Sequence, residues 1–276
     1  MATSYKSFPK MVFFVLVISI IILIIRRDEY IEKLQNGKLP ADSLQQDVAV
    51  PVQVDAPVFE STDLSGGMIG NYIFSNDAAD QSRKKNDGII HGAVLSPDRF
   101  DMPYSALEFN GTDSYVLLPT SYDMQSIDSG LTVLCWINAT ENIADHGIIG
   151  RGGHWGLALR QQRLIGNIFG YPQYNEEVIS RQVISKDKWY FIGLTFNGKA
   201  IRIYINGKLA GKKNTQYSKI GSKVYQWTRE PRIGASFGGF NYYYSGKIDD
   251  VVIYNRALNS TEIEALFAME SFSGLE

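Results

Sequence analysis

Two pairs of adjacent acidic residues are the first candidates for catalysis, Glu176–Glu177 and Asp249–Asp250. Hydrolysis of a glycosidic bond uses two carboxyl groups that flank the bond, so both must project from the same side of the protein. Neighbouring residues of a strand project to opposite faces of a sheet. The spacing therefore predicts that neither pair is a catalytic couple. It leaves acids from separate strands as the alternative route to a glycoside hydrolase.

One serine motif resembles a catalytic nucleophile. The segment Gly234-Ala-Ser236-Phe-Gly238 matches the Gly-x-Ser-x-Gly pattern of a nucleophile elbow. An elbow joins a strand to a helix and needs a histidine later in the chain, whereas all three histidines come before Ser236 and strand-like sequence follows it. We therefore interpret the segment as a turn and predict no catalytic residues.

Two short segments combine aromatic residues with glycine or proline, residues 169–174 and 237–244. Flat rings stack on the faces of sugar rings, and glycine lets a loop adopt conformations that open around a ligand. Four rings next to proline or glycine are therefore the predicted ligand contacts: Tyr171, Tyr174, Phe240 and Tyr242. The alternative is that these rings fill the core of the fold.

The segment Trp189 to Gly211 indicates which elements would position such loops. Its β-branched and aromatic runs are interrupted by Asn197-Gly198 and Asn206-Gly207, which predict two-residue turns between antiparallel strands. In the middle strand, isoleucines at 201, 203 and 205 alternate with Arg202 and Tyr204. One face of this strand is therefore predicted to be buried and the other wet.

Short strand-like runs separated by turn signals recur along the rest of the chain. We expect strands at residues 71–74, 91–95, 106–109, 115–118, 131–138, 147–150, 155–160, 164–169, 178–184, 232–235 and 247–254. One short C-terminal helix is expected after Asn259, because Asn259-Ser-Thr-Glu262 matches a capping box. This order excludes parallel βαβ folds and leaves an antiparallel sandwich or barrel.

Several segments, taken in order, resemble the laminin-G-like, concanavalin A-like jelly-roll family. They are Ala106-Leu-Glu-Phe-Asn-Gly-Thr-Asp-Ser-Tyr-Val-Leu-Leu-Pro, Leu131-Thr-Val-Leu-Cys-Trp-Ile-Asn-Ala, the hairpin ending in Tyr-Ile-Asn-Gly-Lys, Pro231-Arg-Ile-Gly-Ala and Ser245-Gly-Lys-Ile-Asp-Asp-Val-Val-Ile-Tyr-Asn-Arg-Ala-Leu. The resemblance implies an all-β fold, a two-sheet antiparallel jelly-roll sandwich. Glucanases of this fold carry Glu-x-Asp-x-x-Glu on one strand, and this sequence has no such run. The resemblance therefore implies a non-catalytic, carbohydrate-binding or adhesive module.

The resemblance also implies a structural calcium site. Asp80, within residues 77–88, and Asp249, in Ile248-Asp-Asp-Val, match positions where some members bind Ca²⁺ through acidic side chains and loop carbonyls. Three basic residues at 83–85 stand where the family has small residues, and their positive charge opposes cation binding. The alternative is that Asp249 accepts backbone hydrogen bonds at a strand end.

Composition excludes some partners and constraints. A net charge of −2 gives no reason to expect nucleic acid as a partner. Cys135 is the single cysteine, so an intrachain disulfide is impossible. Because it lies within an apolar run, it is expected to be a small buried side chain rather than a reactive thiol.

Residues 11–27 are predicted to form a transmembrane signal anchor. Met11 to Ile25 is an apolar run interrupted only by Ser19, with basic residues on both sides. As a helix it rises about 22 Å, which spans a hydrocarbon core of about 30 Å if the flanking basic side chains reach the interfaces. The following Arg-Arg-Asp-Glu-Tyr lacks the small residues of a cleavage site, which favours an anchor over a removed signal peptide.

The chain is thus expected to comprise a tail (1–10), the anchor (11–27), a juxtamembrane helix and linker (28–65), the jelly-roll domain (66–272) and a tail (273–276). Counting basic residues around the anchor places the domain in the cytoplasm by the positive-inside rule. The resemblance implies an extracytoplasmic or lumenal domain, and we follow it.

In a secretory lumen, Asn110 and Asn138 would be glycosylation sites, since each begins an Asn-x-Thr sequon. The side chain of Asn259, in a third sequon, is expected to cap the helix instead. The predicted protein is a single-pass membrane module whose partners are the lipid bilayer and glycans or a glycoprotein or protein. The alternatives are a coat or envelope protein that uses the jelly roll for packing, and a glycoside hydrolase.

Overall fold

A computed structural model describes residues 63–140, 145–170, 174–221, 230–236, 242–269, 272 and 275. Residues 60–276 form one compact unit. Within the described residues no helix is long and apolar enough to cross a membrane. The apolar run Met11 to Ile25 lies outside the described residues.

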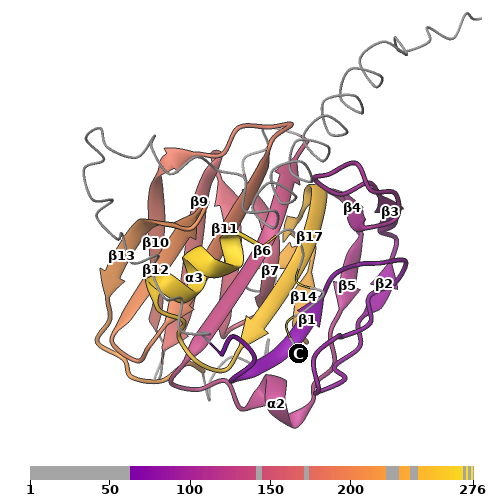
Figure 1. The fold of residues 1–276 in the computed structure, drawn as a ribbon. Coiled ribbons are helices and arrows are strands. Elements are labelled where there is room, and N and C mark those ends of the chain that lie inside the picture. Colours follow the sequence, from indigo (N-terminus) through magenta and orange to yellow (C-terminus); the bar gives the residue numbers. More distant parts are fainter. Residues whose placement is uncertain are drawn as a thin grey trace, which may run out of the picture. The chain divides into compact units, whose positions relative to one another are not determined.

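The described strands form two antiparallel sheets packed face to face (Figure 1). Sheet A has the order β13-β12-β11-β6-β17-β4-β3, with β1 also paired to β17. Its strands are β1 (Met68–Tyr72), β3 (Val94–Ser96), β4 (Ala106–Asn110), β6 (Leu131–Ala139), β11 (Trp189–Phe196), β12 (Ala200–Ile205), β13 (Lys208–Asn214) and β17 (Ser245–Tyr254).

Sheet B has the order β10-β9-β8-β7-β14-β5-β2. Its strands are β2 (Ile89–His91), β5 (Tyr115–Leu117), β7 (Asp145–Arg151), β8 (Trp155–Arg160), β9 (Arg163–Gly170), β10 (Tyr174–Val183) and β14 (Arg232–Ile233). A separate two-stranded hairpin consists of β15 (Ala235–Ser236) and β16 (Tyr242–Tyr243). The all-β, two-sheet jelly-roll prediction is confirmed.

The core lies between the two sheets. The isoleucines of β12 and Cys135 of β6 are buried there, as the alternation predicted. Burial raises the pKa of the Cys135 thiol well above its usual range, so it is a packing residue rather than a reactive one.

A second apolar cluster covers the outer face of sheet A, the face turned away from sheet B. The helix α3 (Ser260–Phe267) lies on this face (Figure 1), and its residues Ile263 and Leu266 are fully buried. Tyr204 of β12 belongs to the same cluster and is only 4 % exposed. The prediction that the outer face of β12 is wet is therefore wrong at Tyr204, because the C-terminal segment packs over it.

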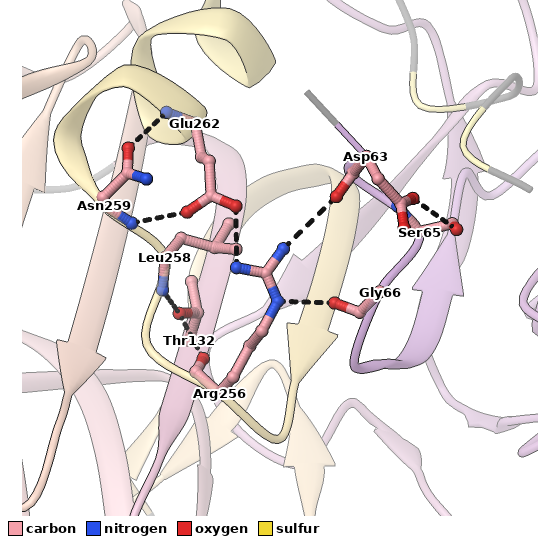
Figure 2. A network of polar contacts seen from close by, with 8 residues as sticks. All are labelled: Asp63, Ser65, Gly66, Thr132, Arg256, Leu258, Asn259 and Glu262. Carbon is pink, nitrogen blue, oxygen red and sulfur yellow. Dashed lines mark hydrogen bonds and ion pairs between the residues drawn. The ribbon is translucent and has the colours of Figure 1, made fainter. Parts of the chain in front are cut away.

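The start of α3 is tied to the start of the described chain (Figure 2). Asn259 and Glu262 form the predicted capping box, with bonds of 3.0 and 2.7 Å. Arg256 lies 2.7 Å from Glu262 and donates hydrogen bonds to the carbonyl oxygens of Asp63 and Gly66. The chain therefore enters the domain beside the N-terminus of α3.

Two local predictions need correction. The turn at Asn206-Gly207 has positive φ at both residues, as a primed two-residue turn requires. In the turn after β11, Gly198 has positive φ but Asn197 does not, so this turn is not a primed two-residue turn. There Asn197 accepts hydrogen bonds from the backbone N–H groups of residues 199 and 200, which closes a three-residue loop.

The strand expected at 91–95 is two strands, β2 in sheet B and β3 in sheet A. The chain passes between the sheets at Gly92, with φ of 67°.

A second described helix, α2 (Tyr122–Gln125), is a single turn capped by the side chain of Ser121. It was not expected from the sequence because four residues are too few to show a helical period.

Candidate ligand-binding surface

Glycines line part of the outer face of sheet B, the face turned away from sheet A. Ile149 and Leu157 point into the core, so Gly150 and Gly156, which follow and precede them, face outward. These two glycines are paired across β7 and β8. The missing side chains leave room for other groups to approach the sheet backbone.

Two polar atoms occupy the space above this glycine pair. A methyl group on Gly156 would lie 2.5 Å from Ser236 Oγ and 2.9 Å from Asn167 Oδ1. One on Gly150 would lie 2.7 Å from the same Ser236 Oγ. Residues 150, 156, 167, 175 and 236 are called the polar patch below.

The polar patch contains hydrogen-bonding atoms without partners. Asn167 is 1 % exposed and Ser236 is 8 % exposed, yet neither Asn167 Oδ1 nor Ser236 Oγ has a hydrogen-bond partner among the residues that the structure describes. The Asn167 amide nitrogen makes one long contact, 3.4 Å from Asn175 Oδ1. Since a buried polar group without a partner costs about 1–3 kcal/mol, this arrangement needs an explanation.

The patch lies between the stems of two hairpins. Asn167 is on β9, which pairs with β10, and Ser236 is on β15, which pairs with β16. The loops of these two hairpins are the aromatic segments singled out in the sequence. The stems of these two hairpins therefore meet above the glycine pair.

An ion-pair network lies on the same face of sheet B. Arg160 contacts Glu177 at 2.9 Å and Asp145 at 3.4 Å, and all three side chains are between 31 % and 41 % exposed. Glu176 instead lies 3.6 Å from Lys213 on β13 of sheet A. Adjacent Glu176 and Glu177 therefore project to opposite sides, as predicted.

The four predicted ligand contacts are only partly within the described structure. Tyr242 is on β16 and 38 % exposed, which fits a position at a rim. Tyr174 is the first residue of β10. Tyr171 and Phe240 lie outside the described residues. Ligand contact by these rings stays a prediction.

Ser236 is not part of a nucleophile elbow. It lies in β15, whose partner is the strand β16. The turn predicted for residues 234–238 is therefore wrong at Ser236, which lies in a strand.

Sequence reasoning missed the role of Ser236 and Asn167 in the polar patch. The one available signal was Asn167 itself, a polar residue inside the apolar run of β9.

Asp80 holds the segment 77–88 against β1. Its carboxylate accepts hydrogen bonds from the backbone N–H groups of Asn71, Ser82 and Asn86 at 2.7–2.8 Å, and from the Ser82 hydroxyl at 2.7 Å. Both oxygens of Asp80 thus have protein partners. No group of three or more side chains suited to a metal occurs among the described residues.

The prediction that Asp249 and Asp250 point to opposite faces is wrong. The register between β17 and β6 shifts after Asp249, and Asp250 has φ of 46°. Such a β-bulge inserts an extra residue and re-aims its side chain. Both carboxylates therefore reach the same atom, Nη1 of Arg99, at 2.8 and 3.0 Å.

This acidic pair is deeply buried on the outer side of sheet A. The Arg99 side chain is 6 % exposed, and its guanidinium carbon lies 4.5 Å from the centre of the Trp136 ring. Burial, followed by the neighbouring charge of Asp250, raises the pKa of Asp249 to about 8, although Arg99 opposes the shift. Asp249 thus has an arginine as its partner, and calcium binding by Asp80 and Asp249 stays a prediction.

The two predicted glycosylation sites differ in their surroundings. The Asn110 amide nitrogen donates to Asp113 at 2.7 Å, and its oxygen accepts bonds from the backbone of residues 112–114. Asn138 is half-buried on β6. Modification of either residue stays a prediction.

The sheet topology defines this protein as an antiparallel jelly-roll sandwich. The model of the concanavalin A-like lectin/glucanases superfamily matches residues 110–264, more than half of the chain. The chain therefore belongs to this family. A comparison with curated proteins gave no match.

Solved structures with a similar fold include several binding domains. The binding domain of Paraclostridial Mosquitocidal Protein 1 superposes with a TM-score of 0.60 at 20 % identity, covering 74 % of this chain and 52 % of that one. The binding domain of Botulinum Neurotoxin DC, in complex with SialylT, gives 0.56 at 16 % identity, covering 77 % and 52 %. This chain thus spans about half the length of these two.

A third structure is matched over nearly its whole length. Domain 4 of AbnA, a GH43 extracellular arabinanase from Geobacillus stearothermophilus, in complex with arabinotriose, gives a TM-score of 0.55 at 17 % identity, covering 72 % of this chain and 97 % of that one. At these identities the similarities establish the fold alone.

Proposed function

We propose that this protein is a non-catalytic carbohydrate-binding module, and that its ligand binds on the outer face of sheet B. The observation that carries the proposal is the pair of unpartnered atoms, Asn167 Oδ1 and Ser236 Oγ, above the glycine pair. The lectin/glucanase family and neighbours solved with a glycan ligand support the same class of function.

The chemistry of the two atoms favours a hydroxyl group as ligand. An amide oxygen only accepts hydrogen bonds, while a serine hydroxyl both donates and accepts. A sugar hydroxyl can donate to Asn167 and exchange a bond with Ser236 at the same time. Pairing them with a ligand would remove the cost of leaving both atoms unsatisfied.

Access to the polar patch requires movement, because both atoms are buried. Ser236 lies on the hairpin β15–β16, which is not part of either large sheet. We infer that this hairpin moves outward when a ligand enters, and that Tyr242 of the same hairpin stacks on the bound sugar.

The arrangement of acids supports a non-catalytic role. Asp145 and Glu177 are carboxylates from separate strands on the outer face of sheet B, as the alternative of a glycoside hydrolase would need. The Arg160 guanidinium bridges them. A glycosidase pair must leave the gap between its carboxyl groups open for the scissile bond, and here a side chain fills it.

We further propose that residues 11–27 anchor this module in a membrane, with the domain displayed outside the cytoplasm. The apolar run supports anchoring. Anchoring many copies in one membrane would strengthen weak individual contacts through multivalency.

A glycan array with residues 60–276 tests the proposal, run with Ca²⁺ and with chelator. We expect binding to at least one glycan, and a loss of about tenfold or more in affinity for Asn167→Ala, the size expected when a polar contact to a hydroxyl ligand is removed. The matched control is Asn138→Ala, an asparagine on the other sheet, which should keep wild-type affinity.

Thermal unfolding of each variant shows whether a lost signal reflects misfolding. Weaker binding in chelator would support the calcium prediction. No binding to any glycan, or equal losses for Asn167→Ala and Asn138→Ala, would exclude the proposed site.

A further inference from the structure

The loop between β3 and β4, residues 97–105, exposes three large apolar side chains. Phe100 is 54 % exposed, Met102 is 57 % exposed and Tyr104 is 59 % exposed. Single exposed apolar residues are ordinary on protein surfaces, whereas three at alternate positions of one loop are a concentrated apolar surface. We call residues 97–105 the apolar loop.

The apolar loop is held in a fixed conformation by its own hydrogen bonds. Asp98 accepts bonds from the backbone N–H groups of Phe100 at 2.8 Å and Met102 at 2.9 Å. The Asp98 N–H in turn donates to the Met102 carbonyl at 3.1 Å. The side chains are therefore presented by a closed loop rather than by a segment free to fold back onto the protein.

The apolar loop is also fastened to sheet A. Its Arg99 side chain binds Asp249 and Asp250 of β17, with its guanidinium between the rings of Phe100 and Trp136. Asp101 and Tyr104 have φ of 62° and 59°, a strained region for residues other than glycine. The ion pairs of Arg99 hold the loop in this strained backbone conformation, and retained backbone strain is typical of functional sites.

The loop lies on the side of the domain where the chain enters. Arg99 contacts Trp136, which packs with the apolar cluster on the outer face of sheet A. Leu64, near the first described residue, packs against the same cluster. The polar patch is on the outer face of the other sheet.

We propose that the apolar loop inserts Phe100, Met102 and Tyr104 into the interfacial layer of a lipid bilayer. The choice of a bilayer rests on the proposed membrane anchoring, because residues 28–62 connect residues 11–27 to the first described residue of this domain in the sequence. Insertion would turn the polar patch away from the membrane, toward a ligand in solution or on another surface.

The chemistry of the apolar loop specifies the kind of membrane contact. Its one basic residue, Arg99, is committed to buried ion pairs, and Asp101 is exposed. The contact therefore depends on apolar and aromatic side chains at the interface rather than on attraction to anionic lipid. It should tolerate salt and should occur on neutral bilayers.

Flotation of residues 60–276 with phosphatidylcholine vesicles tests this proposal. This fragment lacks residues 11–27, so its result is independent of whether the anchor exists, and no glycan is involved. We expect wild-type protein to float with the vesicles, with little change in about 0.5 M salt. Combining Phe100→Ser with Met102→Ser should lower the partition coefficient about tenfold or more.

The matched control is Tyr122→Ser, which removes an exposed ring on α2, where Tyr122 is 85 % exposed. It should not alter flotation. A second measurement uses Phe100→Trp, which keeps an aromatic ring. Its fluorescence should be quenched by brominated lipid, while that of Tyr122→Trp should not.

Three outcomes would overturn the proposal. They are the absence of vesicle binding, binding that requires anionic lipid and is lost in salt, and equal binding by the double variant and wild type. A dimer in solution that the double variant abolishes, without vesicle binding, would assign the apolar loop to contact with a second copy of the chain.

Discussion

The outer faces of the two sheets differ in the side chains that cover them. On sheet A, aromatic residues are packed under α3, and two adjacent acids, Asp249 and Asp250, are buried and bound by Arg99. On sheet B, two polar side chains lie over a pair of glycines, and the acids Asp145 and Glu177 are half-exposed around Arg160. The same sandwich thus has one outer face covered by apolar side chains and one on which two polar atoms without partners among the described residues, Asn167 Oδ1 and Ser236 Oγ, lie above a pair of glycines.

The two outer faces are therefore expected to contribute differently to folding stability and to ligand binding. A face covered by apolar side chains contributes to the free energy of folding and has little left to offer a ligand. A face with buried polar atoms that lack partners gives up stability, and a ligand can recover it. The two arginines make the comparison measurable, because each bridges two carboxylates, one pair buried and the other exposed.

The largest effect is expected for Arg99→Ala. Removing one partner of a buried ion pair leaves uncompensated buried charge, which costs about 3–5 kcal/mol, and here the acidic pair Asp249–Asp250 loses its arginine. The matched variant Arg160→Ala breaks contacts between side chains that are 31–41 % exposed, and should cost no more than about 1 kcal/mol. Urea unfolding of residues 60–276 measures both. Equal costs for the two variants would contradict the distinction between the faces.

The next effect is a pH dependence that arises on sheet A. Burial raises the pKa of Asp249 to about 8, so between about pH 4 and pH 8 the folded protein keeps a proton that the unfolded chain has released. The free energy of unfolding should therefore fall as pH rises through this window, by at most about 1.4 kcal/mol for each pH unit.

Asp249→Asn removes the titrating group but keeps an oxygen that can accept the Asp250 N–H bond. Its unfolding free energy should depend less on pH than that of wild type between pH 4 and pH 8. The control is Asp145→Asn on sheet B. An unchanged slope in Asp249→Asn would assign the pH dependence to other groups.

Features determined by residues close in sequence were predictable. The hairpin at Asn206-Gly207 follows from turn chemistry, and the capping box of α3 involves residues three apart. The burial of Cys135 followed from the apolar run around it. In each case the physical cause lies within a few neighbouring residues, so a single sequence contains it.

Features that join distant segments were not predictable. The bulge at Asp250 brings two carboxylates to Arg99, which is 150 residues away from Asp249 in the sequence. The polar patch joins β7, β8, β9, β10 and β15, and neither Gly156 nor Ser236 carries a local signal of meeting the other. Sequence periodicity assigns a side chain to a face of a sheet, but it does not say what covers that face.

The smallest effect concerns the space above the glycine pair, and a double-mutant cycle measures it. Gly156→Ala would place its methyl group 2.5 Å from Ser236 Oγ, so we expect a loss of about 1–3 kcal/mol in unfolding free energy from overpacking. Ser236→Ala removes that oxygen, and the double variant should recover at least about 0.5 kcal/mol. The recovery should be incomplete, since Asn167 Oδ1 stays 2.9 Å from the new methyl group. Strict additivity would mean that Ser236 does not lie over Gly156 in solution, and the polar patch would then lose its geometric basis.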